Sequence, residues 1–141
     1  LAPRWFMPSL DLSAVKLVVA LDDDASVHHI WDSRLSKLVP LKHFDSGDAL
    51  ETWLKDGCDG LELEEILFLC DYELCGQDRS GLEVIRDNDI AARSVLVTSH
   101  FDESKLQEQC DGLGVRMLPK ALAGIVPILT VKEQARPSLG R

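Results

Sequence analysis

The sequence predicts an α/β fold in which an open, doubly wound parallel sheet carries helices on both faces. Three observations predict this class. Five short apolar runs rich in β-branched residues are spread along the 141 residues, segments of helical period separate them, and three of the runs are hydrophobic almost throughout. Near-continuous hydrophobicity is typical of parallel strands buried on both faces, and regular alternation of strand and helix predicts right-handed crossovers.

The strands are expected at the five apolar runs. They are residues 17–21 (LVVAL), 39–44 (VPLKHF), 66–70 (ILFLC), 94–98 (SVLVT) and 115–118 (VRML). The first, third and fourth runs lack the polar alternation of a strand with one wet face. Helices should therefore cover both sides of the sheet.

Helices are expected between the strands. The first begins near Ser26 as its N-cap and carries an apolar stripe at helical spacing. The residues of this stripe are Val27, Ile30, Trp31, Leu35 and Leu38. The second helix follows residues 45–47 and ends at Gly57, the third lies near 82–90, and the fourth lies near 104–110.

A fifth helix is difficult to place within residues 121–131 (ALAGIVPILTV), because Gly124 and Pro127 interrupt the apolar run. Proline is tolerated in the first turn of a helix but not in its interior. Two alternatives stay open: the helix begins near Val126, or it is short and broken.

The composition indicates one globular domain, since 45% of the residues are hydrophobic and 28% are charged. We expect an N-terminal arm or linker at residues 1–12, the domain at 13–131 and a polar tail at 132–141. No run approaches the roughly 20 apolar residues of a membrane-spanning helix, and no secretory leader is visible. A cytoplasmic location without membrane contact is therefore expected.

The net charge of −9 predicts that this domain repels phosphate backbones, so we expect no nucleic-acid partner for it. Its cysteines, Cys58, Cys70, Cys75 and Cys110, form no CxxC pair. We expect them to be reduced thiols rather than ligands of a zinc site.

Three consecutive carboxylates, Asp22, Asp23 and Asp24, follow the first predicted strand. They repel one another unless a cation or a lysine compensates their charge. Mg²⁺ prefers oxygen ligands and typically uses one or two carboxylates, which fits this cluster. An acidic turn that caps the following helix is the alternative that the carboxylates alone leave open.

Other reactive side chains follow the later strands. Asp71 comes directly after a buried strand, Thr98 and Ser99 end the fourth, and Lys120 follows the fifth. A carboxylate can attack a phosphoryl group when a metal ion screens the repulsion between the two anions. A hydroxyl and a lysine at the same sheet edge can then bind the phosphoryl oxygens.

The segments VVALDDDASV, ILFLCDYEL, SVLVTS and MLPK resemble the four signature stretches of response-regulator receiver domains of two-component systems. The resemblance covers roughly residues 14–131. It implies a flavodoxin-like sheet of five parallel strands in the order 2-1-3-4-5, the order that a chemotaxis receiver exemplifies.

The resemblance also assigns a role to each candidate residue. It implies that Asp71 is the phosphoacceptor, that Thr98 contacts the phosphoryl group and that Lys120 pairs with it. The implied Mg²⁺ ligands are Asp22, Asp23, Asp71 and the backbone carbonyl of Glu73. Gly81 matches the glycine that usually opens the third helix, and Glu73 and His100 match variable positions that influence phosphoryl lifetime.

The chain departs from the family pattern at three places. Ala121 replaces a proline that is often cis, Cys75 replaces a proline after the acceptor, and Met117 replaces the aromatic residue that moves with the threonine. These departures concern how phosphorylation is read out rather than the chemistry. His28 and His29 are expected to be exposed helix residues and not phosphodonors.

The resemblance implies a phosphorelay function, in which a histidine kinase or a histidine phosphotransfer protein donates a phosphoryl group to Asp71 and a protein-interaction surface switches. The domain would catalyse only its own phosphoryl transfer and dephosphorylation, and a homodimer is one expected form. The start at Leu1 and the short tail favour the C-terminal receiver of a hybrid histidine kinase.

Two alternatives remain. One is a pseudo-receiver, an interaction module that is not phosphorylated. The other is a haloacid-dehalogenase-like phosphatase with Asp22 as its nucleophile and Asp24, Thr98 and Lys120 as its other motif residues. The second lacks an acidic pair after Lys120 and leaves Asp71 without a role.

Overall fold

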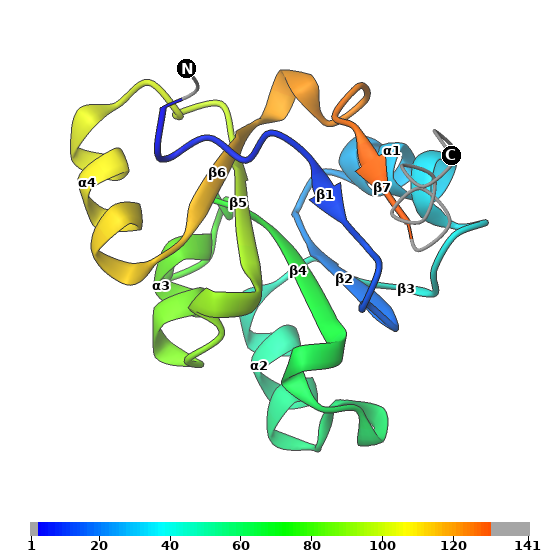
Figure 1. The fold of residues 1–141 in the computed structure, drawn as a ribbon. Helices are drawn as coiled ribbons and strands as arrows, with labels where there is room; N and C mark the ends of the chain where they lie inside the picture. The colour runs from blue at the N-terminus through cyan, green and yellow to red at the C-terminus, as the bar shows by residue number, and fades with distance from the viewer. Residues whose placement is uncertain (1–2, 131–141) are drawn as a thin grey trace, which may run out of the picture.

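The computed structural model describes residues 3–130, and its centre is a sheet of five parallel strands in the order β3-β2-β4-β5-β6 (Figure 1). The strands are β2 (Leu17–Leu21), β3 (Leu41–Phe44), β4 (Ile66–Asp71), β5 (Ser94–Thr98) and β6 (Arg116–Pro119). Counted within this sheet alone, the order is 2-1-3-4-5. The predicted fold class and strand order are confirmed.

Helices cover both faces of the sheet. One face carries α1 (Ala25–Leu35), and the other carries α2 (Gly47–Lys55), α3 (Gly81–Asp87) and α4 (Ser104–Leu113). The short 3-10 turns of the described chain are η1 (Cys58–Gly60), η2 (Leu63–Glu65), η3 (Ala91–Arg93) and η4 (Lys120–Leu122). No helix within residues 3–130 is both long enough and apolar enough to cross a membrane.

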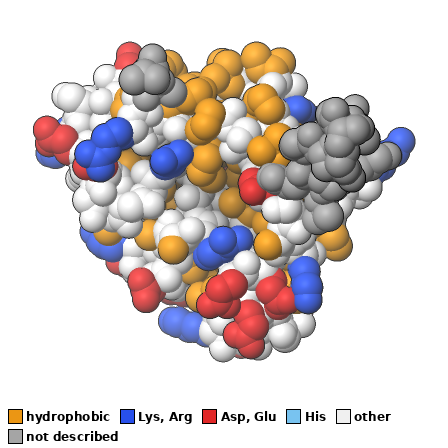
Figure 2. Space-filling view, in the orientation of Figure 1, with side chains coloured by type: hydrophobic (Ala, Val, Ile, Leu, Met, Phe, Trp, Pro, Cys, Tyr) orange, Lys and Arg blue, Asp and Glu red, His pale blue; other side chains and the backbone are white. Residues whose placement is uncertain are grey.

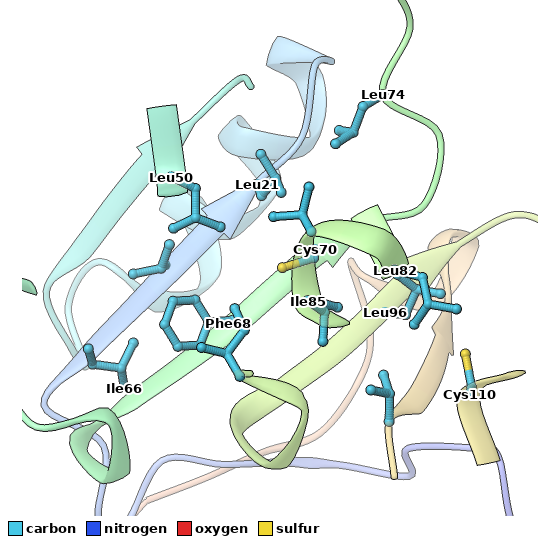
Figure 3. Packing of buried hydrophobic residues seen from close by; sticks show 14 of the residues in the cluster. Leu21, Leu50, Ile66, Phe68, Cys70, Leu74, Leu82, Ile85, Leu96 and Cys110 are labelled. Atoms are coloured by element: carbon cyan, nitrogen blue, oxygen red, sulfur yellow. The ribbon is translucent and has the colours of Figure 1, made fainter. Parts of the chain in front are cut away.

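The larger core lies between the sheet and the three helices α2, α3 and α4. Strand β4 contributes Phe68 and Cys70 to this side, and Leu69 points to the α1 side, as the period of two along a strand requires. Figure 3 shows Phe68 and Cys70 among side chains from the neighbouring strands and helices, including Leu50 and Ile85. Burial on both faces explains why the β4 run is almost continuously hydrophobic.

Helix α1 begins and ends earlier than expected. Asp24, not Ser26, is its N-cap, because the Asp24 carboxylate accepts a hydrogen bond from the Ser26 backbone N–H at 2.9 Å. The helix ends at Leu35, so Leu38 lies outside the apolar stripe and is 52% exposed. Ser46, one of the residues expected before the second helix, is the N-cap of α2 and accepts from the Ala49 N–H at 3.1 Å.

No fifth α-helix exists within the described residues. Of the two alternatives, a helix that begins near Val126 is wrong, and the chain forms only one short turn before Pro127. After the single turn η4, the chain forms β7 (Ile128–Leu129), which pairs in parallel with β1 (Leu10–Asp11). The Leu10 N–H donates to the Pro127 carbonyl at 2.9 Å. Because Pro127 has no N–H and fits no helix interior, an extended segment that offers its carbonyl satisfies the backbone better.

We call the pair of strands β1 and β7 the terminal ribbon. It covers the α1 side of the sheet, where Leu10 and Leu12 pack with Ala123 and Val126. Figure 1 shows β1 and β7 side by side in front of the central sheet. In the same orientation, Figure 2 shows hydrophobic side chains at the surface in this region and acidic ones gathered at the lower edge of the molecule.

Residues before β1 also pack on the domain. Phe6 forms an isolated parallel bridge with Met117, whose N–H donates to the Trp5 carbonyl at 2.6 Å. The Trp5 ring lies 5.8 Å from the ring of Phe101. The segment expected as an arm therefore extends the sheet beyond β6, although a domain boundary at residue 12 stays a prediction.

Candidate functional site: an acidic pocket at the strand ends

The parallel sheet brings the predicted site residues to one edge. Asp22 follows the last residue of β2, Asp71 ends β4, Thr98 ends β5, and Lys120 follows β6. Because all these strands run in the same direction, their carboxyl ends meet. Residues that are far apart in the sequence therefore lie at the same edge of the sheet.

The carboxylates of Asp22, Asp23 and Asp71 form what we call the acidic pocket, with one oxygen of each within 4.8 Å of the others. The Lys120 ammonium lies 3.0 Å from the Asp71 carboxylate and 3.3 Å from that of Asp22. Asp22 is only 2% exposed and Asp71 only 4%. The charge of Lys120 therefore offsets only part of the charge of three carboxylates, two of which are buried.

Local hydrogen bonds hold the acidic side chains in place. Asp22 accepts from the Asp24 N–H at 2.9 Å, and Asp23 accepts from the Cys75 N–H at 3.0 Å. The Cys75 contact joins the loop after β4 to the loop after β2. Asp24 points away to cap α1 and does not belong to the pocket, which argues against a phosphatase that uses Asp22 and Asp24 together.

Burial shifts the pKa of the two buried carboxyl groups, Asp71 and Asp22. It raises the pKa of Asp71 to about 6, the hydrogen bond from Lys120 opposes this rise, and the charge of Asp22 adds to it. Burial also raises the pKa of Asp22, against the hydrogen bond from the Asp24 N–H and the charge of Lys120. Burial disfavours the charge of Lys120, but Asp71 and Asp22 outweigh it and raise the pKa of the ammonium.

The donor set of the pocket fits Mg²⁺. It offers three carboxylates at short mutual distance and, among the described residues, no histidine or cysteine belongs to the cluster. Hard oxygen ligands suit Mg²⁺, which keeps several waters and needs few protein ligands. A divalent ion would also relieve the repulsion that Lys120 leaves uncompensated.

Two other predicted residues stand at the neighbouring strand ends, Thr98 at the end of β5 and Glu73 two residues after β4. Thr98 is 1% exposed, and its hydroxyl oxygen accepts from the His100 N–H at 2.9 Å. The Glu73 side chain contacts the His100 ring, whose other nitrogen lies 2.5 Å from the Glu103 carboxylate. The roles predicted for the Thr98 hydroxyl and the Glu73 carbonyl stay predictions.

Gly81 allows the chain to pass directly behind Asp71. A Cβ at this position would lie 1.6 Å from the Asp71 carbonyl oxygen, far inside any permitted contact. The Gly81 N–H also donates to the Tyr72 carbonyl at 2.8 Å. Only glycine therefore permits α3 to start so close to the end of β4.

The positions that depart from the receiver pattern have clear structural settings. Met117 is fully buried between β5 and the Trp5 segment, and it pairs in register with Leu96. No cis peptide bond occurs in residues 3–130, so the bond before Ala121 is trans. Cys75 is exposed beside the pocket.

The surroundings of His28, next to the pocket, differ from the expectation. His28 is partly buried, and its Nε2 lies 2.7 Å from the Asp22 carbonyl oxygen, so the expectation that it is simply exposed is wrong. Its Nδ1 lies 2.5 Å from Nδ1 of His43, whereas His29 is exposed as expected. The sequence gives no local sign of this pair, because His28 lies in α1 and His43 in β3, and the two elements come together only when the chain folds.

Comparisons with known proteins find similarity in solved structures. No family model matches the sequence, and no curated protein matches it. The receiver domain of the histidine kinase CKI1 from Arabidopsis thaliana, in complex with Mg²⁺ and BeF₃⁻, is 19% identical over 76% of this chain and 82% of its own, with a TM-score of 0.59.

Two bacterial structures are similar in the same way. A response regulator receiver protein from Pseudomonas putida is 21% identical over 75% of this chain and 85% of its own, with a TM-score of 0.56. The receiver domain of a Luxo repressor protein from Vibrio parahaemolyticus is 16% identical over 89% and 88%, with the same TM-score of 0.56. With this strand order and these neighbours, the chain has the fold of response-regulator receiver domains.

Proposed function

We propose that the protein is a phosphoacceptor receiver domain of a two-component phosphorelay and that Asp71 carries the phosphoryl group. The observation that carries the proposal is the setting of Asp71. Its carboxylate is nearly buried, belongs to a cluster of three carboxylates and lies 3.0 Å from the Lys120 ammonium. A buried carboxylate in such a cluster is not stabilised by solvent as a surface carboxylate is. It is well placed to accept a phosphoryl group when a divalent cation also binds.

The proposed reaction is a transfer between two groups. An oxygen of the ionised Asp71 carboxylate forms a bond to phosphorus, while the bond from phosphorus to the donor's nitrogen or oxygen breaks and the leaving group takes that electron pair. Lys120 already lies at the Asp71 carboxylate and would bind a phosphoryl oxygen. The Thr98 hydroxyl would donate to another.

The proposed cofactor is Mg²⁺, held by the carboxylates of Asp22, Asp23 and Asp71 and by the Glu73 carbonyl. When bound, it would neutralise the charge that develops on the transferred group. The short distances within the carboxylate cluster support this ligand set. The complex of the CKI1 receiver domain with Mg²⁺ and BeF₃⁻ supports it by analogy.

A histidine kinase or a histidine phosphotransfer protein is the proposed donor, since receiver domains interact with such proteins. The similarity to a receiver domain of a histidine kinase is consistent with a hybrid kinase as the parent protein. A cytoplasmic setting, a homodimer as one form of the protein and the lack of a nucleic-acid partner remain parts of the same proposal.

Labelling with radioactive acetyl phosphate in Mg²⁺ tests the proposal. The folded protein should incorporate one phosphoryl group, and Asp71→Asn should abolish the label because the nucleophilic oxygen is lost. Asp24→Asn is the matched control, since Asp24 lies beside the pocket but points away from it.

Two results would contradict the assignment. A label that persists in Asp71→Asn would place the acceptor elsewhere. A folded wild-type protein that takes no label, and whose amide spectrum does not respond to BeF₃⁻ with Mg²⁺, would instead be a pseudo-receiver.

A further inference from the structure

Two imidazole rings face each other outside the acidic pocket, between helix α1 and strand β3. His28 lies in the first part of α1 and His43 near the end of β3. Their Nδ1 atoms are 2.5 Å apart, and their ring planes are nearly perpendicular at 84°. Neither ring belongs to the machinery proposed for phosphoryl transfer.

The far nitrogen of each ring meets an oxygen that can only accept. Nε2 of His28 lies 2.7 Å from the Asp22 backbone carbonyl, and Nε2 of His43 lies 2.7 Å from the Asp32 carboxylate. When both rings are neutral, these contacts place the hydrogen of each ring on Nε2. A neutral imidazole has a single N–H, so both Nδ1 atoms are left with a lone pair.

The two lone pairs point at each other. The ring centroids are 4.5 Å apart. This is only slightly less than the distance expected if the 2.5 Å between the Nδ1 atoms were extended in a straight line by the radius of each ring. Both nitrogens therefore lie close to the line that joins the rings. Two lone pairs in this arrangement repel, unless a positively charged species lies between them.

We propose that His28 and His43 form a binding site for a transition-metal ion of the zinc class. Imidazole nitrogen suits Zn²⁺, whereas Mg²⁺ prefers oxygen. With Zn–N bonds of about 2.0 to 2.1 Å and tetrahedral geometry, the two nitrogens would stand about 3.3 Å apart. The rings need to separate by less than about 1 Å. Among the described residues no third histidine, cysteine or carboxylate groups with this pair, and both rings are partly exposed, so waters would fill the remaining positions of the ion.

The groups behind the two rings have the arrangement of a second coordination layer. The Asp32 carboxylate and the Asp22 carbonyl fix which nitrogen of each ring is free and hold the planes in position. The Asp22 contact also ties this histidine pair to the backbone of the acidic pocket. The site is separate in chemistry from the pocket but adjacent to it in space.

Calorimetric titration of Zn²⁺ into the reduced protein, kept in excess Mg²⁺, tests the proposal. We expect one Zn²⁺ per chain, with binding lost in His28→Gln and in His43→Gln and retained in His29→Gln, the exposed neighbour on the same helix. Asp32→Ala should weaken binding by about tenfold or more, because it removes only the group that orients His43. Thermal unfolding of each variant confirms that the loss is not a loss of fold.

Further variants separate this site from its neighbours. Asp23→Asn and Cys75→Ser remove a pocket carboxylate and the exposed thiol and should keep Zn²⁺ binding. In nitrogen-15 spectra, the resonances of both imidazoles should shift on addition of Zn²⁺. The proposal would be overturned if Zn²⁺ binding survived in His43→Gln or disappeared in Asp23→Asn or Cys75→Ser. It would also be overturned if the wild-type protein bound no Zn²⁺ and the two rings shared only a proton. None of these outcomes depends on whether Asp71 is phosphorylated.

Discussion

The acidic pocket and the terminal ribbon are built from the sequence in opposite ways. Each pocket residue lies at or next to the end of a sheet strand, so finding the strands also locates Asp22, Asp71 and Lys120. The ribbon joins β1 with β7, near the two ends of the described chain. Nothing local to either segment indicates the other. A site on strand ends can therefore be read locally, whereas a ribbon of two-residue strands cannot.

The two regions meet at η4. Lys120 opens this turn and reaches into the pocket, and Ala123, just after the turn, is buried against the ribbon. The ribbon thus supports the backbone that positions Lys120. The following changes separate chemical from structural contributions in the two regions.

The largest effect is expected for Gly81→Ala, at the back of the pocket. The new Cβ would lie 1.6 Å from the Asp71 carbonyl oxygen, and this oxygen belongs to the backbone of the central strand. We expect a loss of more than about 3 kcal/mol in the free energy of unfolding, measured by urea denaturation.

Gly112→Ala is the control, because a Cβ there meets nothing within 4 Å. Gly112 lies in α4, so alanine should be neutral or stabilising by up to about 1 kcal/mol. Equal effects of the two substitutions would contradict the close approach at Gly81.

The next effect concerns the pH dependence of the pocket without divalent ions. The pKa of Asp71 is raised from 3.8 to about 6, mainly by burial. Because the folded value is the higher one, the contribution of this carboxyl to stability is complete below about pH 4 and is lost as the pH rises through about 6.

Relative to Asp71→Asn, the wild type should therefore lose up to about 3 kcal/mol of unfolding free energy between pH 4 and pH 7 in EDTA. Urea denaturation at several pH values measures this difference. Saturating Mg²⁺ should reduce the loss in the wild type and leave the variant nearly unchanged. Parallel pH curves for the two proteins would show that Asp71 is not held in a dry, acidic setting.

A comparable loss is expected in the ribbon for Leu10→Ala. Leu10 is 1% exposed and packs against the α1 side of the sheet. Its truncation should cost about 2 to 3 kcal/mol by thermal or urea unfolding. Leu38→Ala, at an apolar residue that is 52% exposed, should be nearly neutral.

The Leu10→Ala protein that remains folded should still take a label from acetyl phosphate, since the substitution leaves the pocket side chains intact. Loss of labelling without loss of folding would show that the ribbon contributes directly to the chemistry of the pocket. The comparison between the two regions would then have to be revised.

The smallest effect is expected for Asp24→Ala. Asp24 caps α1 through the Ser26 N–H, and losing such a cap costs about 1 kcal/mol. Labelling with acetyl phosphate should be retained, because the Asp24 side chain lies outside the pocket. An abolished label in a stable Asp24→Ala protein would reopen the phosphatase alternative.

The departures at the readout positions show where sequence reasoning stops. The sequence identifies Met117 as an unusual residue in place of an aromatic one, but it does not reveal that the Trp5 segment pairs with it. Likewise, His28 is readable as a helix residue, but its contact with His43 depends on how α1 lies over β3. In both contacts, the sequence around one residue gives no information about which residue it will meet.

The sequence by itself determined the sheet, the strand order through its likeness to receivers, and the acidic, hydroxyl and lysine residues at one edge. It could do so because parallel strands buried on both faces have a strong hydrophobic pattern and their carboxyl ends must coincide. Only the tertiary structure revealed the pairing of β1 with β7, the segment around Trp5 that lies along β6, and the contact between His28 and His43. Those features arise from backbone groups and side chains that find partners far along the chain, and a local pattern carries no information about such partners.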